Sequence, residues 1–166
     1  QVLAGTGDFT TGGILTIGIE SSVIVVLLML FAYGIGKAAL IPIHRWLPNA
    51  MVAPTPVSAL LHAVAVVKAG VFSVVKIVTY IFGPALLTDI LDTNYLLYIA
   101  GFTIIYASII ALRSDNLKRR LAYSTISQLS YVVLATALLA PISIMGAAMH
   151  ILAHAFGKIT LFFAAG

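Results

Sequence analysis

YLLYIAGFTIIYASIIAL, residues 95–112, contains no charged side chain. An α-helix rises 1.5 Å per residue, so a run of about this length can cross the hydrocarbon core of a bilayer. The rest of the chain has the same character, because 61% of its 166 residues are hydrophobic and only 8% are charged. Soluble domains usually carry about 25% charged residues. The sequence therefore predicts an integral membrane protein.

Apolar runs of similar length recur along the chain. They are continuous and rich in Leu, Ala, Ile and Val, which favours membrane helices. The predicted fold is an all-α, polytopic transmembrane bundle of about five spans. The predicted spans cover residues 23–50, 55–82, 95–112, 118–140 and 142–166.

The first span is predicted to be interrupted near Pro42. Residues 34–62 read GIGKAALIPIHRWLPNAMVAPTPVSALLH and contain four prolines. Proline lacks the amide donor of a helix and disfavours a helical residue before it. We expect one helical piece up to about Leu40, a break near Pro42, a short second piece carrying Trp46, and a turn at residues 54–56.

Lys37 lies one turn before this predicted break. Carbonyl groups freed by a broken membrane helix can accept hydrogen bonds from a buried cation. The alternative is that Pro42 marks the exit from the membrane and that Trp46 is an anchor at the interface. The sequence leaves both readings open.

Charged residues outside the spans predict an orientation. The basic residues are His44, Arg45, Arg113, Lys118, Arg119 and Arg120, in two loops on one side, whereas Asp8, Glu20, Asp89 and Asp92 fall on the other. Short basic loops stay on the cytoplasmic side of a membrane, or on its equivalent in an organelle. We expect a bacterial or archaeal cell membrane. The net charge of +4 follows from these loops and requires no nucleic acid.

Seven basic side chains lie inside the predicted spans: Lys37, His62, Lys68, Lys76, His150, His154 and Lys158. Lys76 is near a helix end and can extend its ammonium group to the interface. A cation at the bilayer centre costs roughly 2.5–3.5 kcal/mol on insertion scales, so the other six are expected to face a polar interior or internal water.

The stretch HILAHAFGKI, residues 150–159, places His150, His154 and Lys158 four residues apart. Each step of four advances about 40° around a helix, so the three side chains form one stripe. Histidine titrates near neutral pH, and lysine can release a proton when it is buried. The six deep residues therefore predict a proton relay.

Other chemistries are less well supported by the sequence. A metal site at His150 and His154 lacks carboxylate or thiolate companions, and Lys158 would repel the ion, so no metal ligand is assigned. The chain has no cysteine. It therefore holds no disulfide or iron–sulfur cluster, and we expect no cofactor in this chain. Any redox centre is expected in another subunit.

The fourth span adds uncharged polar side chains: Ser124, Thr125, Ser127, Gln128 and Ser130. These groups can join helices through hydrogen bonds or hold water.

The chain does not begin with Met, shows no secretory signal, and ends in an apolar run. We expect an internal piece of a longer protein.

Three motifs together resemble a known family. They are GKAALIPIHRWLPNAMVAPTPVSALLHAVAVVKAG (36–70), NLKRRLAYSTISQLSY (116–131) and HILAHAFGKITLFFAAG (150–166). This combination resembles the antiporter-like membrane subunits of respiratory complex I (NADH-quinone oxidoreductase) and of Mrp-type Na+/H+ antiporters. The resemblance implies the central part of a proton-translocating subunit built from inverted five-helix repeats, each with one broken helix.

The resemblance also implies roles for the deep residues. Lys37 is similar to the family's key lysine beside the broken helix, and His62 with Lys68 match bridging positions on the next helix. The residues His150, His154 and Lys158 match a motif that links two half-channels. The implied partners are other hydrophobic subunits of a complex I-like or Mrp complex, the lipid bilayer, protons and possibly Na+.

The family pairs the lysine at the position of Lys37 with a glutamate on an earlier helix. Glu20 is 17 positions before Lys37, about 25 Å along a helix, and cannot reach it. We therefore expect the partner glutamate to lie in helices outside this chain. The chain by itself is then not expected to transport protons. The run GVFSVVKIVTYIFG (70–83) and Lys68 resemble Mrp-type and related hydrogenase subunits more than the largest antiporter-like subunit of complex I.

The leading hypothesis is thus a proton-translocating subunit of an oxidoreductase or antiporter complex, without redox chemistry of its own. The rival is a non-transporting helical scaffold whose polar side chains only hold helices together. A metal transporter that uses the two histidines of the stripe is a distant third.

Overall fold

The structure is a computed structural model and describes residues 14–15, 20–88 and 95–165. Its regular elements are helices: α1 (Ser21–Gly34), η1 (Gly36–Ala38), α2 (Trp46–Asn49), η2 (Ala50–Val52), α3 (Thr55–Ala59), η3 (Leu60–Val64), α4 (Val66–Lys76), η4 (Ile77–Phe82), α5 (Pro84–Thr88), α6 (Tyr95–Arg113), α7 (Leu117–Ala137) and α8 (Pro141–Ala165). The acids Asp8, Asp89 and Asp92, which entered the predicted orientation, lie outside the described residues.

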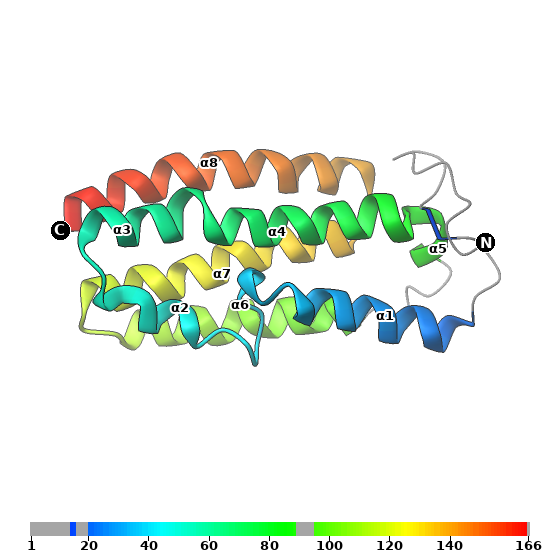
Figure 1. Cartoon of the computed structure of the whole chain (residues 1–166), viewed down its shortest axis with the longest axis horizontal. Coiled ribbons are helices and arrows are strands. Elements are labelled where there is room, and N and C mark those ends of the chain that lie inside the picture. The colour runs from blue at the N-terminus through cyan, green and yellow to red at the C-terminus, as the bar shows by residue number, and fades with distance from the viewer. Residues whose placement is uncertain (1–13, 16–19, 89–94, 166) are drawn as a thin grey trace.

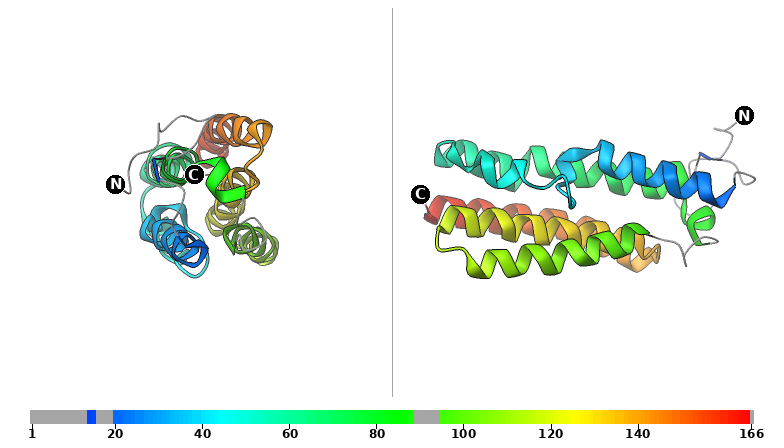
Figure 2. Two further views of the ribbon diagram at one scale, coloured as in Figure 1. Left: turned by 90° about the vertical axis from the view of Figure 1, so that its right-hand side faces the viewer. Right: turned by 90° about the horizontal axis from the view of Figure 1, so that it is seen from below.

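The helices form an elongated bundle whose long elements run side by side (Figure 1). The segments α3, η3, α4 and η4 follow one another as a single helix, Thr55–Phe82. Helix α7 contacts α6, α8 and α4, and α1 packs against α6. The view along the bundle shows these helices grouped around a shared interior (Figure 2). Val67 and Val71 of α4 and Leu129 of α7 are fully buried there.

Among the described residues, three helices are long and apolar enough to cross a membrane: Thr55–Phe82, Tyr95–Arg113 and Pro141–Ala165. They follow the second, third and fifth predicted spans closely. Helix α7 has 21 residues and matches the fourth predicted span, although its first turn is basic. Helix α1 is apolar but has only 14 residues. The predicted all-α membrane bundle is confirmed.

Local signals explain where the long helices begin. Asn116 caps α7, because its side-chain oxygen accepts a hydrogen bond from the backbone N–H of Arg119 at 3.2 Å. Pro141 is the first residue of α8, where its missing N–H has no helical partner to lose. Pro54 is extended before α3, and Pro56 occupies the first turn of that helix. The prolines therefore set boundaries, as the sequence predicted.

The break in the first span begins earlier than predicted. Helix α1 ends at Gly34 and is followed by the single 3₁₀ turn of η1. The predicted helical piece up to Leu40 is wrong, because glycines at 34 and 36 are weak helix formers and Ala39 adopts a left-handed conformation with φ 55°. Lys37 therefore lies inside the break and not one turn before it.

Three hydrogen bonds hold the broken segment in place. The indole Nε1 of Trp46 donates to the carbonyl oxygen of Gly36 at 3.0 Å. The hydroxyl of Tyr33 donates to the carbonyl oxygen of Ile41 at 3.1 Å, and the backbone N–H of Ile41 donates to Thr103 Oγ1 of α6 at 3.4 Å. The hydrogen bond from Trp46 to Gly36, which we call the Trp46 clip, thus joins the two ends of the broken segment, whatever the position of Trp46 relative to the membrane interface.

We expect Trp46→Phe to destabilise the protein by about 0.5–1.5 kcal/mol, since the ring is kept but its hydrogen bond is lost. The measurement is the midpoint of unfolding in detergent. Tyr98→Phe is the control, because Tyr98 is exposed on α6 and its hydroxyl makes no hydrogen bond within the described chain. If Trp46→Phe and Tyr98→Phe had the same unfolding midpoint, the Trp46 clip would not stabilise the protein.

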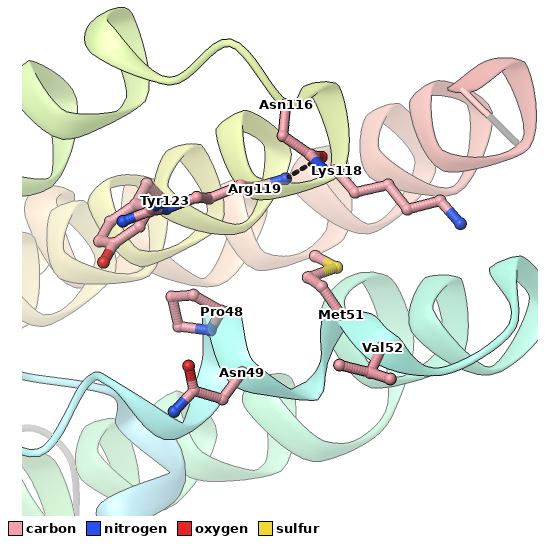
Figure 3. A pocket seen from close by; sticks show the side chains of 8 residues that line it. All are labelled: Pro48, Asn49, Met51, Val52, Asn116, Lys118, Arg119 and Tyr123. Carbon is pink, nitrogen blue, oxygen red and sulfur yellow. Dashed lines mark hydrogen bonds between the residues drawn. The ribbon is translucent and has the colours of Figure 1, made fainter.

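The segment that follows the break approaches the start of α7 at one end of the bundle. A cavity of about 560 Å³ lies there between α2–η2 and the start of α7. Figure 3 shows its lining: Pro48, Asn49, Met51, Val52, Asn116, Lys118, Arg119 and Tyr123. Lys118 Nζ donates to Thr55 Oγ1 at 3.3 Å, which joins α7 to the start of α3. That both basic loops share one side of the membrane stays a prediction.

Candidate functional site

His150, His154 and Lys158 form one stripe along α8, as their spacing predicted. Lys158 is buried, with 4% of its surface exposed, and His154 is 9% exposed, whereas His150 is half-buried. The rings of His150 and His154 stack with centroids 6.1 Å apart and planes 19° from parallel. Because α8 packs on α3, η3 and α7, the stripe faces the bundle interior.

Lys68 joins this stripe from α4. Its Nζ atom is hydrogen-bonded to Nδ1 of His154, a contact between side chains 86 positions apart in the sequence. An ammonium group can only donate, so Nδ1 of His154 is then the acceptor and the ring hydrogen sits on Nε2. This contact is one along which a proton can pass directly between two titratable groups.

Lys158 is held by the backbone of α7. Its Nζ atom donates to the carbonyl oxygen of Leu121 at 3.1 Å. The same oxygen accepts the hydroxyl of Thr125 at 2.8 Å. Thr125, one of the polar residues predicted to matter in the fourth span, therefore shares an acceptor with Lys158. Lys158 lies one helical turn along α8 from His154, the partner of Lys68.

His62 lies in the π-helical segment η3, between α3 and α4. Its side chain is fully buried, and its ring packs on Phe162 of α8 with centroids 5.3 Å apart. Phe162 continues the stripe one step of four beyond Lys158. We call the five residues His62, Lys68, His150, His154 and Lys158 the basic cluster.

Several nitrogen atoms of the basic cluster have no hydrogen-bond partner among the residues that the structure describes. They are both ring nitrogens of His62 and Nε2 of His150 and His154. A buried polar atom without a partner costs free energy, so such atoms are normally satisfied by a neighbour or by internal water. In the described residues the only carboxylates belong to Glu20 and Asp115, and both are exposed. The described part of the cluster therefore contains bases without acids.

A second cavity opens beside the cluster. It has a volume of about 400 Å³, lies between α7 and α8, and is lined by Gln128, Tyr131, Leu134, Ala135, Leu138, Gly146, Ala147 and His150. His150 and Gln128 supply polar groups there, which is what internal water requires. The larger cavity of Figure 3 is lined by none of the cluster residues.

The remaining polar residues of the fourth span are mainly structural. Ser127 shares a hydrogen bond of 2.9 Å with Ser108 of α6 and so joins the two helices. Ser130 donates to the carbonyl oxygen of Ile126 in its own helix at 3.0 Å. Ser124 is half-buried and makes no hydrogen bond within the described ranges. The bridging predicted for this span is thus seen at Ser127.

The structure does not bring Lys37 together with the basic cluster. Its side chain is exposed and makes no hydrogen bond or ion pair to any described residue. Its backbone, in η1, packs against α4. Lys76, assigned to the interface, is also exposed and lies over the ring of Tyr80 at 4.3 Å from the centroid. Five of the six predicted relay residues therefore gather at one place.

Sequence reasoning missed two contributors to the site and the burial of one histidine outside it. Phe162 obeys the same spacing of four as the stripe, so periodicity could have found it. The carbonyl oxygen of Leu121 carries no sequence signal. His44 was assigned to a loop, yet it is 5% exposed and its ring packs on Tyr106 and Tyr123 at 5.6 and 6.4 Å between centroids.

Across the described chain, no group of three or more His, Cys, Asp or Glu side chains could hold a metal ion.

Comparisons with known proteins agree on one family. The sequence profile described as NADH:quinone oxidoreductase/Mrp antiporter, TM, matches residues 3–166. NAD(P)H-quinone oxidoreductase subunit 5 from the chloroplast of Phaseolus vulgaris is 40% identical over 139 residues, which cover 84% of this chain and 18% of that protein. The same subunit of Helianthus annuus is 40% identical over 139 residues, or 83% of this chain and 18% of that protein.

A solved structure shares the fold. A chain in the structure of the Mrp complex from Dietzia sp. DQ12-45-1b is 36% identical and superimposes with a TM-score of 0.74, over 86% of this chain and 15% of that chain. The present chain thus spans less than a fifth of the length of these relatives.

Proposed function

Because this chain belongs to the NADH:quinone oxidoreductase/Mrp antiporter membrane family, we propose that it forms part of a subunit that moves protons across a membrane. The basic cluster carries this proposal. It gathers five titratable side chains inside a bundle of membrane helices, with a direct hydrogen bond between Lys68 and His154. Isolated bases in a membrane interior are costly, and a shared polar interior reduces that cost.

Protons enter or leave the cluster through the cavity between α7 and α8. His150 lines this cavity, and its ring stacks on His154. Water in the cavity bridges the two imidazoles, since a centroid separation of 6.1 Å is too long for direct transfer. When Lys68 is a neutral amine, its Nζ atom accepts the proton from Nδ1 of a protonated His154 along the hydrogen bond between their side chains.

Lys158 and His62 continue the route on the far side of Lys68. No described carboxylate neutralises the two lysines, so a second ammonium group beside the first is electrostatically unfavourable. A proton arriving at one lysine therefore favours release of a proton from the other. This coupling moves charge along the cluster without any covalent step.

The wider setting is part of the same proposal. The subunit works among other hydrophobic subunits of an oxidoreductase or Mrp-type complex, and electrons, where they are used, are carried by those partners. The transported ion is the proton, and Na+ exchange is a property of the complete complex. The loops that carry Arg45 and residues 113–120 face the cytoplasm or the equivalent organellar compartment, as expected for short basic loops.

We assign Lys37 to the same relay by its resemblance to the family's key lysine, although it lies outside the basic cluster. Lys37 tests the proposal, because the structural-scaffold alternative assigns it no task. In the complete complex, Lys37→Ala is expected to reduce proton translocation about tenfold or more. Lys37→Arg keeps the charge but cannot release a proton, and should show a similar loss. The measurement is proton uptake into proteoliposomes, with assembly checked by native gel electrophoresis. Full translocation by the alanine variant would contradict the relay and leave the scaffold.

A further inference from the structure

Gly70 marks the closest approach between the broken segment and helix α4. A Cβ atom at position 70 would lie 2.5 Å from the carbonyl carbon of Lys37, 2.7 Å from the backbone nitrogen of Ala38 and 2.8 Å from Cβ of Lys37. Two of these three atoms are backbone atoms. A side chain at position 70 therefore has no space unless the segment around Lys37 moves away from α4.

The broken segment cannot move away freely, because it is fixed on its other sides. Ala38 and Ala39 are 1% and 0% exposed. The carbonyl oxygen of Gly36, one residue before Lys37, accepts the indole hydrogen of Trp46 at 3.0 Å. The close approach at Gly70 and the Trp46 clip thus both fix the backbone next to Lys37.

The same helix holds the basic cluster on another face. Gly70 follows Lys68 by two positions, which is about 3 Å along α4 and about 200° around it. Lys68 points toward His154 of α8, whereas Gly70 receives the backbone of η1. Helix α4 therefore fixes the distance between the Cβ atom of Lys37 and Lys68 of the basic cluster.

We propose that Gly70 is a positioning residue for Lys37: its lack of a side chain lets the broken helix sit directly on α4 and fixes the place of Lys37 relative to Lys68. This proposal rests on the proposed function for its effect on transport. Its geometric part, the placement of Lys37, can be measured without transport.

The transport test compares two glycine-to-alanine variants in the complete complex. Gly70→Ala is expected to lower proton translocation about tenfold and to shift its pH profile, because a small misplacement of a reacting group is costly. Gly101→Ala in α6 is the matched control. It adds the same methyl group and the same helix propensity, but its nearest neighbour, Leu134 Cδ1, lies 3.8 Å away in ordinary contact.

The placement test uses a cysteine at position 37, made the only reactive thiol of the protein. In this Lys37→Cys background, Gly70→Ala should change the rate of reaction with a water-soluble maleimide by about threefold or more, since reactivity follows exposure. Gly101→Ala should leave the rate unchanged. If Lys37 were dispensable for transport, the proposed function would fail. The thiol reaction rate would still show whether Gly70 fixes the position of residue 37.

Equal thiol reactivity and equal pH profiles for Gly70→Ala and Gly101→Ala would overturn the proposal. If Gly70→Ala alone does not assemble, Trp46→Phe is added to release the clip and let the segment shift. The double variant should then assemble and transport less than Trp46→Phe alone. Transport equal to that of Trp46→Phe, or failure of the double variant to assemble, would assign Gly70 to the fold and overturn its role for Lys37.

Discussion

Lys68→Met in the complete complex is expected to reduce proton translocation about 100-fold, the range in which loss of a positioned acid–base group usually falls. Methionine fills a similar space in the bundle but carries no proton. The substitution also removes the hydrogen bond to Nδ1 of His154, the direct contact between titratable side chains of the basic cluster. The measurement is the initial rate of proton uptake into proteoliposomes at equal amounts of assembled complex.

Two further lysine variants sharpen this test. Lys68→Arg keeps the positive charge and the donor but cannot release a proton, so translocation should remain low. Lys76→Met is the matched control on the same helix, because Lys76 is exposed and lies over the rings of Phe72 and Tyr80 away from the cluster. Normal rates for Lys68→Arg would show that charge alone matters and would exclude proton transfer at this residue.

Much of the fold was predictable, because a membrane helix requires a continuous apolar run that is visible in the local sequence. Continuous apolar runs predicted the helices Thr55–Phe82, Tyr95–Arg113 and Pro141–Ala165 within a few residues. Pro42 correctly indicated a broken helix, but the exact end of α1 depends on the backbone conformation of Ala39 and on the weak propensity of two glycines. Proline shows that a helix is interrupted, not how far the interruption extends.

The candidate site was predictable only along single helices. A spacing of four placed His150, His154 and Lys158 on one face, because that rule is a property of the helix itself. Which faces meet is decided by packing, so the pairing of Lys68 with His154, 86 positions away, needed the structure. The acceptor of Lys158 could not be predicted either, since any backbone carbonyl can serve and it leaves no mark in the sequence.

The relay and the scaffold predict different behaviour for different cluster residues. Lys68 and Lys158 make hydrogen bonds that join helices, so their loss could harm either function. His62 is different, because both of its ring nitrogens lack a partner in the described part of the chain and its contact with Phe162 is between rings. A scaffold gains no hydrogen bond from this histidine and pays for burying its nitrogens. We therefore expect His62 to serve the relay and not the scaffold.

His62→Leu is therefore expected to separate the two functions. Leucine is similar in volume and keeps the apolar contact with Phe162, so assembly and the unfolding midpoint should be unchanged or slightly higher. Proton translocation should fall about 100-fold, because the route beyond Lys158 then lacks its imidazole. Phe162→Leu is the control, since it alters the same contact from α8 but keeps the imidazole. Normal translocation by a well-assembled His62→Leu complex would favour the scaffold, because a fully buried histidine would then have no part in moving protons.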